Sequence, residues 1–203
     1  MRAALLAAAL CLGGMAFAHG DEDHGTPAAL DLSGAVTPLP WDVGGPFALT
    51  DHTGAPRTQV DPNGQHQLLF FGYASCPGIC SAALPLMADA VDALGKDGVD
   101  VSPILLTIDP KLDTPDTMGP ALADLSPDFV GLTGEPEALN AAYSAYRVTF
   151  EHLFDDPDYG PIYSHGSHIY LLDPAGEVLT LLPPVLPAEQ VVAIVKRYTS
   201  AGE

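Results

Sequence analysis

Residues 67–80 of this chain read QLLFFGYASCPGIC. The first half is a continuous apolar run, which is typical of a strand buried on both faces of a sheet. Cys76 and Cys80 follow with three residues between them, and Pro77 stands where a helix is expected to begin. A buried strand that leads into a helix at a pair of thiols predicts an α/β fold with a reactive or metal-binding site at the carboxyl end of the strand.

The spacing of the two cysteines suits either redox or metal chemistry. If both lie in the first helical turn, their i, i+4 spacing places the two sulfurs on one face. The unpaired N–H groups and the positive dipole end of that turn favour the thiolate, which is both a nucleophile and a soft metal ligand. A purely structural disulfide would close a loop of only three residues, which restricts the unfolded chain little. The motif therefore leaves a redox enzyme and a copper carrier open.

The segments around this motif predict alternating strands and helices. Residues 46–54 predict a small hairpin, and residues 149–160 form an acidic stretch that we expect to be irregular. We expect strands at 67–73, 99–108, 129–132, 168–173 and 177–182, and helices at 76–95, 114–125, 133–146 and 187–198. The order β-α-β-α-β-α-β-β-α after the hairpin predicts an α/β sandwich with a central mixed sheet.

The first 18 residues predict an export signal. Arg2 precedes an apolar stretch that ends in Ala16-Phe17-Ala18, a small-x-small cleavage pattern. An apolar stretch of about 15 residues is short for the ~20 that span a bilayer, so we expect cleavage and no stable membrane span afterwards. The sequence thus predicts a periplasmic or otherwise exported protein that is soluble after cleavage. Cys11 would leave with the signal.

The rest of the chain divides into a tail and one domain. Residues 19–41 are acidic, contain Pro and Gly and lack periodicity, which predicts a flexible tail before a domain at 42–203. In this tail the new N-terminal amine, His19 and His24 could chelate Cu(II). The whole chain carries a formal net charge of −19, which repels phosphate backbones. Nucleic acid is therefore not expected as a partner.

Two thiolates leave a metal ion under-coordinated, so a third ligand is needed. The best candidates are His165 and His168, in the segment YSHGSH at residues 163–168. Two sulfurs and one imidazole suit Cu(I) and can also hold Cu(II), and zinc could use the same donors with a water. Because the two positions differ by an odd number, strand-like pairing would turn one to the site and the other away. The remaining histidines of the predicted domain, His52, His66 and His152, are predicted to lie on the surface.

The run from Phe70 to Cys80 resembles the SCO/SenC family of copper-binding thioredoxin-like proteins. The signature of that family combines a glycine, two cysteines with three residues between them, and a distant histidine. Three further segments match: residues 45–51, residues 107–115, and His165 with residues 170–176. The resemblance covers about residues 42–200.

The resemblance implies both a fold and a function. It implies a thioredoxin-like three-layer sandwich in which Cys76, Cys80 and His165 bind copper. It further implies delivery of copper to the dinuclear copper centre of cytochrome c oxidase subunit II, or reduction of the cysteines of that subunit before metallation. Another copper-accepting protein could replace subunit II, and a thioredoxin-like protein could act as the reductant.

Some positions beside the motif depart from the family or leave a role open. Asp109 matches an acidic family position, where it could support the site or contact a partner, or could simply end a strand. The family usually has Asp where this chain has Gly78, often Pro at Ser81, and an acidic residue at Ser164. These changes remove charges beside the site and leave all three ligands in place.

Two functions compete with a copper chaperone. Cys76 and Cys80 could act as the redox-active pair of a thiol-disulfide oxidoreductase, or the domain could sense copper or redox state. Thioredoxin-like reductases place two residues between the cysteines and a cis-proline before the facing strand, whereas Ser167 and His168 stand there in this chain. Peroxiredoxins place Thr where this chain has Tyr73. A carrier is therefore favoured over an enzyme.

Overall fold

The computed structural model describes residues 39–200. The predicted signal at 1–18, His19, His24 and all but the last three residues of the predicted tail lie outside this range. Across residues 39–200, every helix falls short of the length or the apolarity that crossing a membrane requires.

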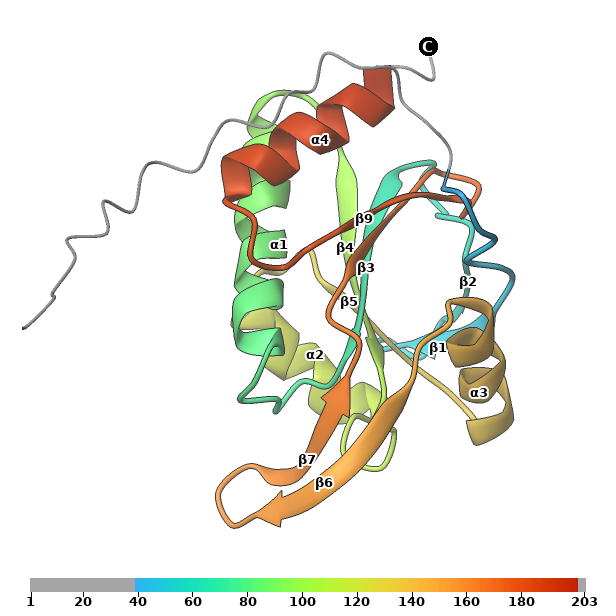
Figure 1. The fold of residues 1–203 in the computed structure, drawn as a ribbon, viewed down its shortest axis with the longest axis vertical. Coiled ribbons are helices and arrows are strands. Elements are labelled where there is room, and N and C mark those ends of the chain that lie inside the picture. Colours follow the sequence, from blue (N-terminus) through green and yellow to red (C-terminus); the bar gives the residue numbers. More distant parts are fainter. Residues whose placement is uncertain (1–38, 201–203) are drawn as a thin grey trace, which may run out of the picture.

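A seven-stranded mixed sheet forms the centre of the domain, with the strand order β2-β1-β5-β4-β3-β8-β9 (Figure 1). Strands β3, β4 and β5 are parallel, while β8 runs antiparallel to β3 and β1 runs antiparallel to β5. The predicted α/β architecture with a mixed sheet and an added N-terminal hairpin, β1–β2, is confirmed. The strands are β1 Ala48–Asp51, β2 Pro56–Thr58, β3 His66–Gly72, β4 Val101–Thr107, β5 Val130–Thr133, β8 Ile169–Leu172 and β9 Val178–Leu182.

Helices cover both faces of this sheet. Figure 1 shows α1 and α4 side by side on one face and α3 on the other, which gives the three layers expected. The predicted helices are thus present; they are α1 Cys80–Lys96, α2 Pro115–Ala123, α3 Pro136–Ala145 and α4 Ala188–Ser200.

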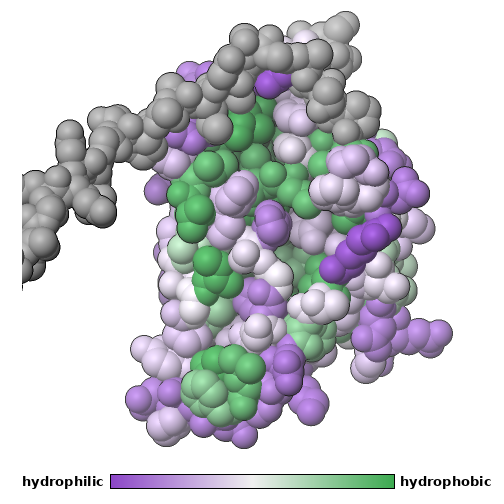
Figure 2. Space-filling model, viewed as in Figure 1, coloured by the Kyte–Doolittle hydropathy of each residue, from purple (hydrophilic) through white to green (hydrophobic). Residues whose placement is uncertain are grey.

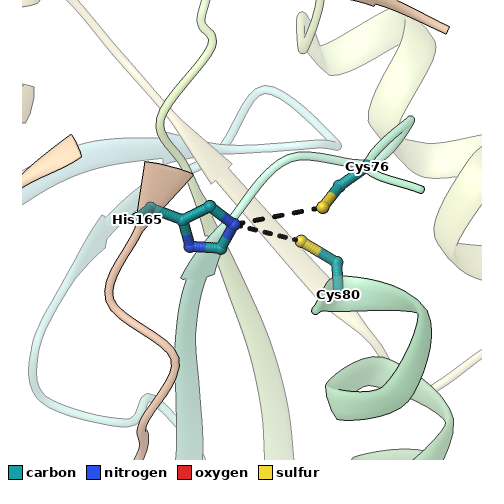
Figure 3. Close-up of side chains that lie close together, drawn as sticks. All are labelled: Cys76, Cys80 and His165. Atoms are coloured by element: carbon teal, nitrogen blue, oxygen red, sulfur yellow. Dashed lines mark hydrogen bonds between the residues drawn. The ribbon is translucent and has the colours of Figure 1, made fainter. Parts of the chain in front are cut away.

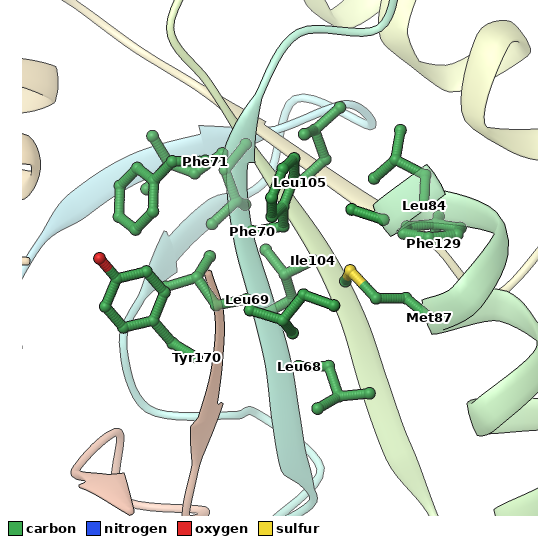
Figure 4. Packing of buried hydrophobic residues seen from close by; sticks show 14 of the residues in the cluster. Leu68, Leu69, Phe70, Phe71, Leu84, Met87, Ile104, Leu105, Phe129 and Tyr170 are labelled. Carbon is green, nitrogen blue, oxygen red and sulfur yellow. The ribbon is translucent and has the colours of Figure 1, made fainter. Parts of the chain in front are cut away.

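Strand β3 is deeply buried and positions the cysteine motif. Residues 68–71 are each at most 1% exposed, because β3 lies between β4 and β8 and side chains cover both of its faces. Phe71 packs edge to face on Tyr170 at 5.5 Å on one side of the sheet, and Met87 of α1 lies on the other (Figure 4). Burying one such side chain stabilises the fold by about 1.5–3 kcal/mol. The end of β3, and the loop that follows it, are therefore held firmly in place.

The prediction of an irregular stretch at 149–160 is wrong. These residues form most of a separate two-stranded hairpin, β6 Phe150–Asp156 and β7 Gly160–His165. Nearly every residue of β6 is exposed, so the strand shows no alternation of apolar and polar side chains. The turn closes through Asp156, whose carboxylate accepts the backbone N–H groups of Asp158 and Tyr159.

The predicted start of the first helix is also wrong. Helix α1 begins at Cys80, and Cys76 lies in the preceding loop rather than in the first helical turn. The Cys76 N–H donates to the carbonyl of Tyr73 at 3.2 Å, which closes a turn directly after β3. That turn delays the helix by about one helical turn.

Candidate metal centre

Three side chains from three different segments meet at the carboxyl end of β3 (Figure 3). Cys76 comes from the loop after β3, Cys80 is the first residue of α1, and His165 is the last residue of β7. The Nε2 atom of His165 lies 3.9 Å from the Cys76 sulfur and 3.7 Å from the Cys80 sulfur, and all three donor atoms lie within 4.8 Å of one another. Such a group could hold a metal ion.

The structure separates the two candidate histidines. His165 is half-buried and belongs to the donor group, although it ends a strand rather than lying in a loop as its Gly/Ser surroundings suggested. His168 is exposed and lies outside the group. The structure thus places one of the two imidazoles beside the sulfurs. Residues 166–168 lie between β7 and β8 and form no strand, so the alternation that the odd spacing assumed does not operate here.

The ring of His165 is oriented for metal binding. Its Nδ1 lies 2.8 Å from the carbonyl oxygen of Gly166, which can only accept a hydrogen bond. This contact assigns the ring proton to Nδ1 and leaves the lone pair of Nε2 facing the sulfurs. Phe70 and Tyr73 pack edge to face against the ring, with centroids at 6.0 and 6.1 Å.

The donor types favour Cu(I), and the distances fit one ion held by nitrogen and sulfur together. A metal about 2.3 Å from sulfur and about 2.0 Å from nitrogen, with an angle of about 120°, separates the two donors by about 3.7 Å. The observed separations are 3.7 and 3.9 Å. Structural zinc sites take four protein ligands, whereas the group found within residues 39–200 has three, two of them soft sulfurs.

The two thiols differ in acidity although they are neighbours. The neighbouring Cys80 thiol lowers the pKa of Cys76 despite the burial of Cys76. The Cys76 side chain, together with burial, raises the pKa of Cys80. Cys76 is 9% exposed and Cys80 is 1% exposed. Cys76 is therefore the thiol that ionises first and that an incoming group reaches first.

Gly72 makes room for the Cys80 sulfur. A Cβ atom at this position would lie 2.8 Å from that sulfur and 2.8 Å from the ring of Phe70. The close approach of α1 to β3 at the site therefore depends on the missing side chain.

We expect Gly72→Ala to lose about 1–3 kcal/mol of unfolding free energy, because overpacking forces neighbours to shift. Displacement of the Cys80 sulfur should weaken Cu(I) binding in the same variant. Gly95→Ala in α1 is the matched control, since its added Cβ meets nothing within 4 Å, and it should be neutral or gain at most about 1 kcal/mol. Urea unfolding and Cu(I) competition measure both effects. A Gly72→Ala protein that matches the wild type in both would contradict this packing account.

A buried carboxylate holds the loop that carries Cys76. Asp113 is 3% exposed, and its Oδ2 accepts the Ala74 N–H at 3.0 Å and the Thr107 hydroxyl at 2.7 Å. Burial raises the pKa of Asp113, and the charges of Asp109 and Cys76 act in the same direction. Asp113 therefore joins the end of β4 to the cysteine loop. The free energy that its buried, ionised carboxylate costs the folded state depends on pH.

Two substitutions separate these roles of Asp113. Asp113→Ala leaves the Ala74 N–H and the Thr107 hydroxyl without their acceptor and should cost at least about 2 kcal/mol. Asp113→Asn keeps an acceptor oxygen and removes the charge. A carboxyl whose pKa is raised by folding binds protons more tightly in the native state, so it destabilises the native state progressively as pH rises above about 4. In urea unfolding, the free energy of unfolding of Asp113→Asn should therefore rise relative to that of the wild type as the pH is raised from 5 to 8. Equal losses in both variants at both pH values would show that the charge itself is needed.

Asp109 is buried beside this group but is not one of the three donors. It is 2% exposed, and its Oδ2 has no hydrogen-bond partner within residues 39–200. Asp113 differs in this respect, because its Oδ2 accepts two hydrogen bonds from described residues.

The prediction that the other histidines lie on the surface holds only for His152, which is exposed and pairs with Asp155 at 3.0 Å. His66 is half-buried at the start of β3, and burial lowers its pKa. His52 is also half-buried, and its Nδ1 accepts the Gly131 N–H at 3.1 Å. This hydrogen bond joins positions 79 residues apart in the chain, so the local sequence carried no sign of it.

Two residues that support the site were not predicted from the sequence. Gly72 and Asp113 both lie within recognised motifs, but neither was assigned a role. A carboxylate shortly after a buried strand was the available signal for Asp113, since such positions lie at the reactive edge of the sheet. The closeness of Gly72 to the Cys80 sulfur is seen only in the structure.

Comparison with known proteins gives matches over this same domain. The family model described as SCO1/SenC matches residues 36–200. Protein SenC of Rhodobacter capsulatus is 38% identical over 133 residues, which cover 65% of this chain and 59% of that protein. The human mitochondrial protein SCO1 homolog is 37% identical over 139 residues, which cover 68% of this chain and 46% of that protein. The match thus spans about half the length of these curated relatives.

A solved relative shares the fold. The structure of Bradyrhizobium japonicum ScoI with copper bound is 34% identical in sequence, with a TM-score of 0.68, and covers 77% of this chain and 99% of that one. The expected thioredoxin-like architecture agrees with this match.

Proposed function

This chain belongs to the SCO1/SenC family, and on that premise we propose that it is a copper metallochaperone. In this proposal Cys76, Cys80 and His165 bind one Cu(I) ion as cargo. The observation that carries the proposal is the donor group itself, with two sulfurs and the Nε2 lone pair within 4.8 Å of one another. The copper-bound structure of the B. japonicum relative supports the choice of metal.

The placement of the donors suits release as well as binding. His165 borders a surface hollow that Phe150, Glu151 and Gly166 also line. A Cu(I) ion with three ligands can accept a fourth, so an incoming thiolate can bind before one of the original donors leaves. Exchange of this kind requires an approach to the ion, and in this proposal the incoming group approaches from the hollow beside His165.

The proposed recipient is the dinuclear copper centre of cytochrome c oxidase subunit II, in line with the family resemblance. The test is to mix the Cu(I)-loaded protein, without oxygen, with the metal-free copper domain of subunit II and to measure copper in each protein after separation. We expect copper to move to subunit II. Copper that stays with this chain, while a small chelator extracts it readily, would mean that the recipient is wrong.

A second candidate function uses the same two thiols. The lowered pKa of Cys76 favours attack of its thiolate on a disulfide of a substrate protein. The mixed disulfide would then be resolved by Cys80, which forms the Cys76–Cys80 disulfide and releases two thiols on the substrate. A dithiol reductant of the thioredoxin type would restore the pair. Since copper needs both thiolates, the two functions would exclude each other at any one moment.

We also propose that the protein is exported, with cleavage before His19, a tail at 19–41 and the copper domain at 42–203. Support comes from the pattern of residues 1–18. N-terminal sequencing of the protein recovered from the periplasm would test both the compartment and the cleavage site.

A further inference from the structure

A pocket of about 290 Å³ lies beside the candidate metal centre. The residues that follow β4, helix α3 and the β6–β7 hairpin line it. Leu139 and Tyr143 of α3 and Phe150 and Tyr163 of the hairpin form apolar walls, and Asp109 belongs to the lining. The pocket therefore combines an apolar wall with one buried acidic group.

One oxygen of the Asp109 carboxylate, Oδ2, lacks a hydrogen-bond partner in the described part of the chain. Asp109 is 2% exposed, and its Oδ2 makes no hydrogen bond there. Lys111 also lines the pocket but makes no ion pair within residues 39–200. Leaving a buried carboxylate oxygen unpaired is costly, so an N–H group that reached it would recover a hydrogen bond to a charged acceptor.

The hairpin next to this pocket exposes apolar side chains. Leu153, Phe154 and Tyr159 are 53%, 54% and 54% exposed. The hairpin strands pair only with each other within the described residues. Figure 2 shows hydrophobic surface gathered at the lower end of the molecule, where Figure 1 places the hairpin.

The charges on the hairpin have one sign. Between Phe150 and His165 it carries no Lys or Arg, and its acidic residues are Glu151, Asp155, Asp156 and Asp158. A surface that is apolar and acidic complements one that is apolar and basic.

The pocket is coupled to the candidate metal centre by packed rings. Phe150 pairs with His165 across the hairpin. The ring of Tyr163 lies 6.1 Å from Phe150 and 5.4 Å from Tyr73, and Tyr73 in turn packs on His165 at 6.1 Å. A side chain bound in the pocket would therefore sit one layer of aromatic rings away from a copper ligand.

We propose that this pocket receives a basic side chain, an arginine, from the copper-accepting protein, and that the exposed apolar side chains of the hairpin form the rest of the contact. This inference rests on the proposed hand-over of copper. The stem of an arginine packs on apolar walls, its guanidinium stacks on aromatic faces, and its N–H groups match a carboxylate. Arginine in a desolvated pocket is also a common anchor of protein interfaces.

A peptide titration tests the occupant without copper. The reduced, metal-free full chain is titrated with acetyl-Leu-Arg-Leu-amide, followed by the NMR amide signals of Asn140 and Tyr163. The control peptide carries citrulline, which has the shape of arginine without its charge. We expect saturable shifts with the arginine peptide and binding about tenfold weaker with citrulline. Equal binding of the two peptides, or no binding of either at millimolar concentration, would overturn the proposal.

A variant pair locates the contact. Asp109→Asn should weaken binding of the arginine peptide about tenfold and leave binding of the citrulline peptide unchanged. Asp124→Asn, an exposed acidic residue outside the pocket lining, is the matched control and should change neither. If Asp109→Asn binds the arginine peptide as tightly as the wild type, the pocket is not the site.

Transfer kinetics test the hairpin. The double variant Leu153→Ser, Phe154→Ser should pass Cu(I) to the copper domain of subunit II at least about tenfold more slowly and to a small chelator at the wild-type rate. Val185→Ser, which removes an apolar side chain that is 78% exposed, is the control. Unchanged transfer by the double variant would overturn the hairpin contact. If the wild-type protein passes no copper to subunit II, the proposed recipient is wrong, and so is the proposed contact between the hairpin and that recipient. The peptide titration does not depend on the recipient, so it still tests whether the pocket binds arginine.

Discussion

Cys76→Ser and Cys80→Ser are each expected to lower the Cu(I) affinity of the reduced protein by more than about a hundredfold. Loss of a group that only orients a metal ligand typically costs about 10- to 100-fold, and the loss of a ligand itself should exceed that. A serine hydroxyl stays protonated near neutral pH and is a hard donor, so it does not replace a soft thiolate for Cu(I). In each variant the ion would keep one sulfur and one nitrogen of the group at the end of β3.

Anaerobic competition with a chromogenic chelator measures this loss. Ser81→Ala is a suitable control, because Ser81 follows Cys80 directly but its hydroxyl donates to the Gly78 carbonyl at 2.6 Å and does not belong to the donor group. It should stay within about twofold of wild type. If either cysteine variant retains tight Cu(I) binding, the two thiols do not share one ion. The same variants should lose disulfide reductase activity if the second candidate function is present.

His165→Ala is expected to weaken Cu(I) binding by about a hundredfold, and His168→Ala by less than about twofold. The two residues lie three positions apart, yet His165 is in the donor group and His168 is exposed outside it. The Nδ1 contact with Gly166 already directs Nε2 at the sulfurs, so little reorganisation accompanies binding and most of the lost affinity reflects the ligand itself.

The comparison of these two variants is informative because they share a segment and a residue type. Each should unfold at nearly the wild-type urea concentration in the absence of metal, since neither side chain belongs to the buried core. Equal losses of copper affinity in both variants would mean that His168 also reaches the ion. Loss in His168→Ala alone would mean that the ligand was assigned to the wrong histidine.

The elements that position the site were predictable because their signals are local and strong. The apolar run at 68–71 predicted a strand buried on both faces, and the structure has it inside the sheet, between β4 and β8. Cys76, Cys80 and His165 were identified from residue chemistry together with a family resemblance. The resemblance was needed for the histidine, because a Gly/Ser-flanked histidine by itself indicates a surface turn.

What could not be predicted depends on contacts between distant residues. The β6–β7 hairpin shows no periodicity, since both faces of its first strand are exposed. The delayed start of α1 follows from a turn held in part by Asp113, whose bond to the Ala74 N–H spans 39 residues. The Asp109 oxygen that lacks a hydrogen-bond partner among residues 39–200 is recognisable only once β4, α3 and the hairpin are assembled around it. Propensity and spacing describe none of these relations.

The central claim is that one Cu(I) ion is bound by two sulfurs and one imidazole, and X-ray absorption at the copper edge of the Cu(I)-loaded protein tests it most directly. The account predicts one copper per chain with two sulfur neighbours at about 2.3 Å and one nitrogen neighbour at about 2.0 Å, and a spectrum without the nitrogen in His165→Ala. Copper ligated by sulfur alone in the wild-type protein, with a spectrum unchanged by His165→Ala, would contradict it.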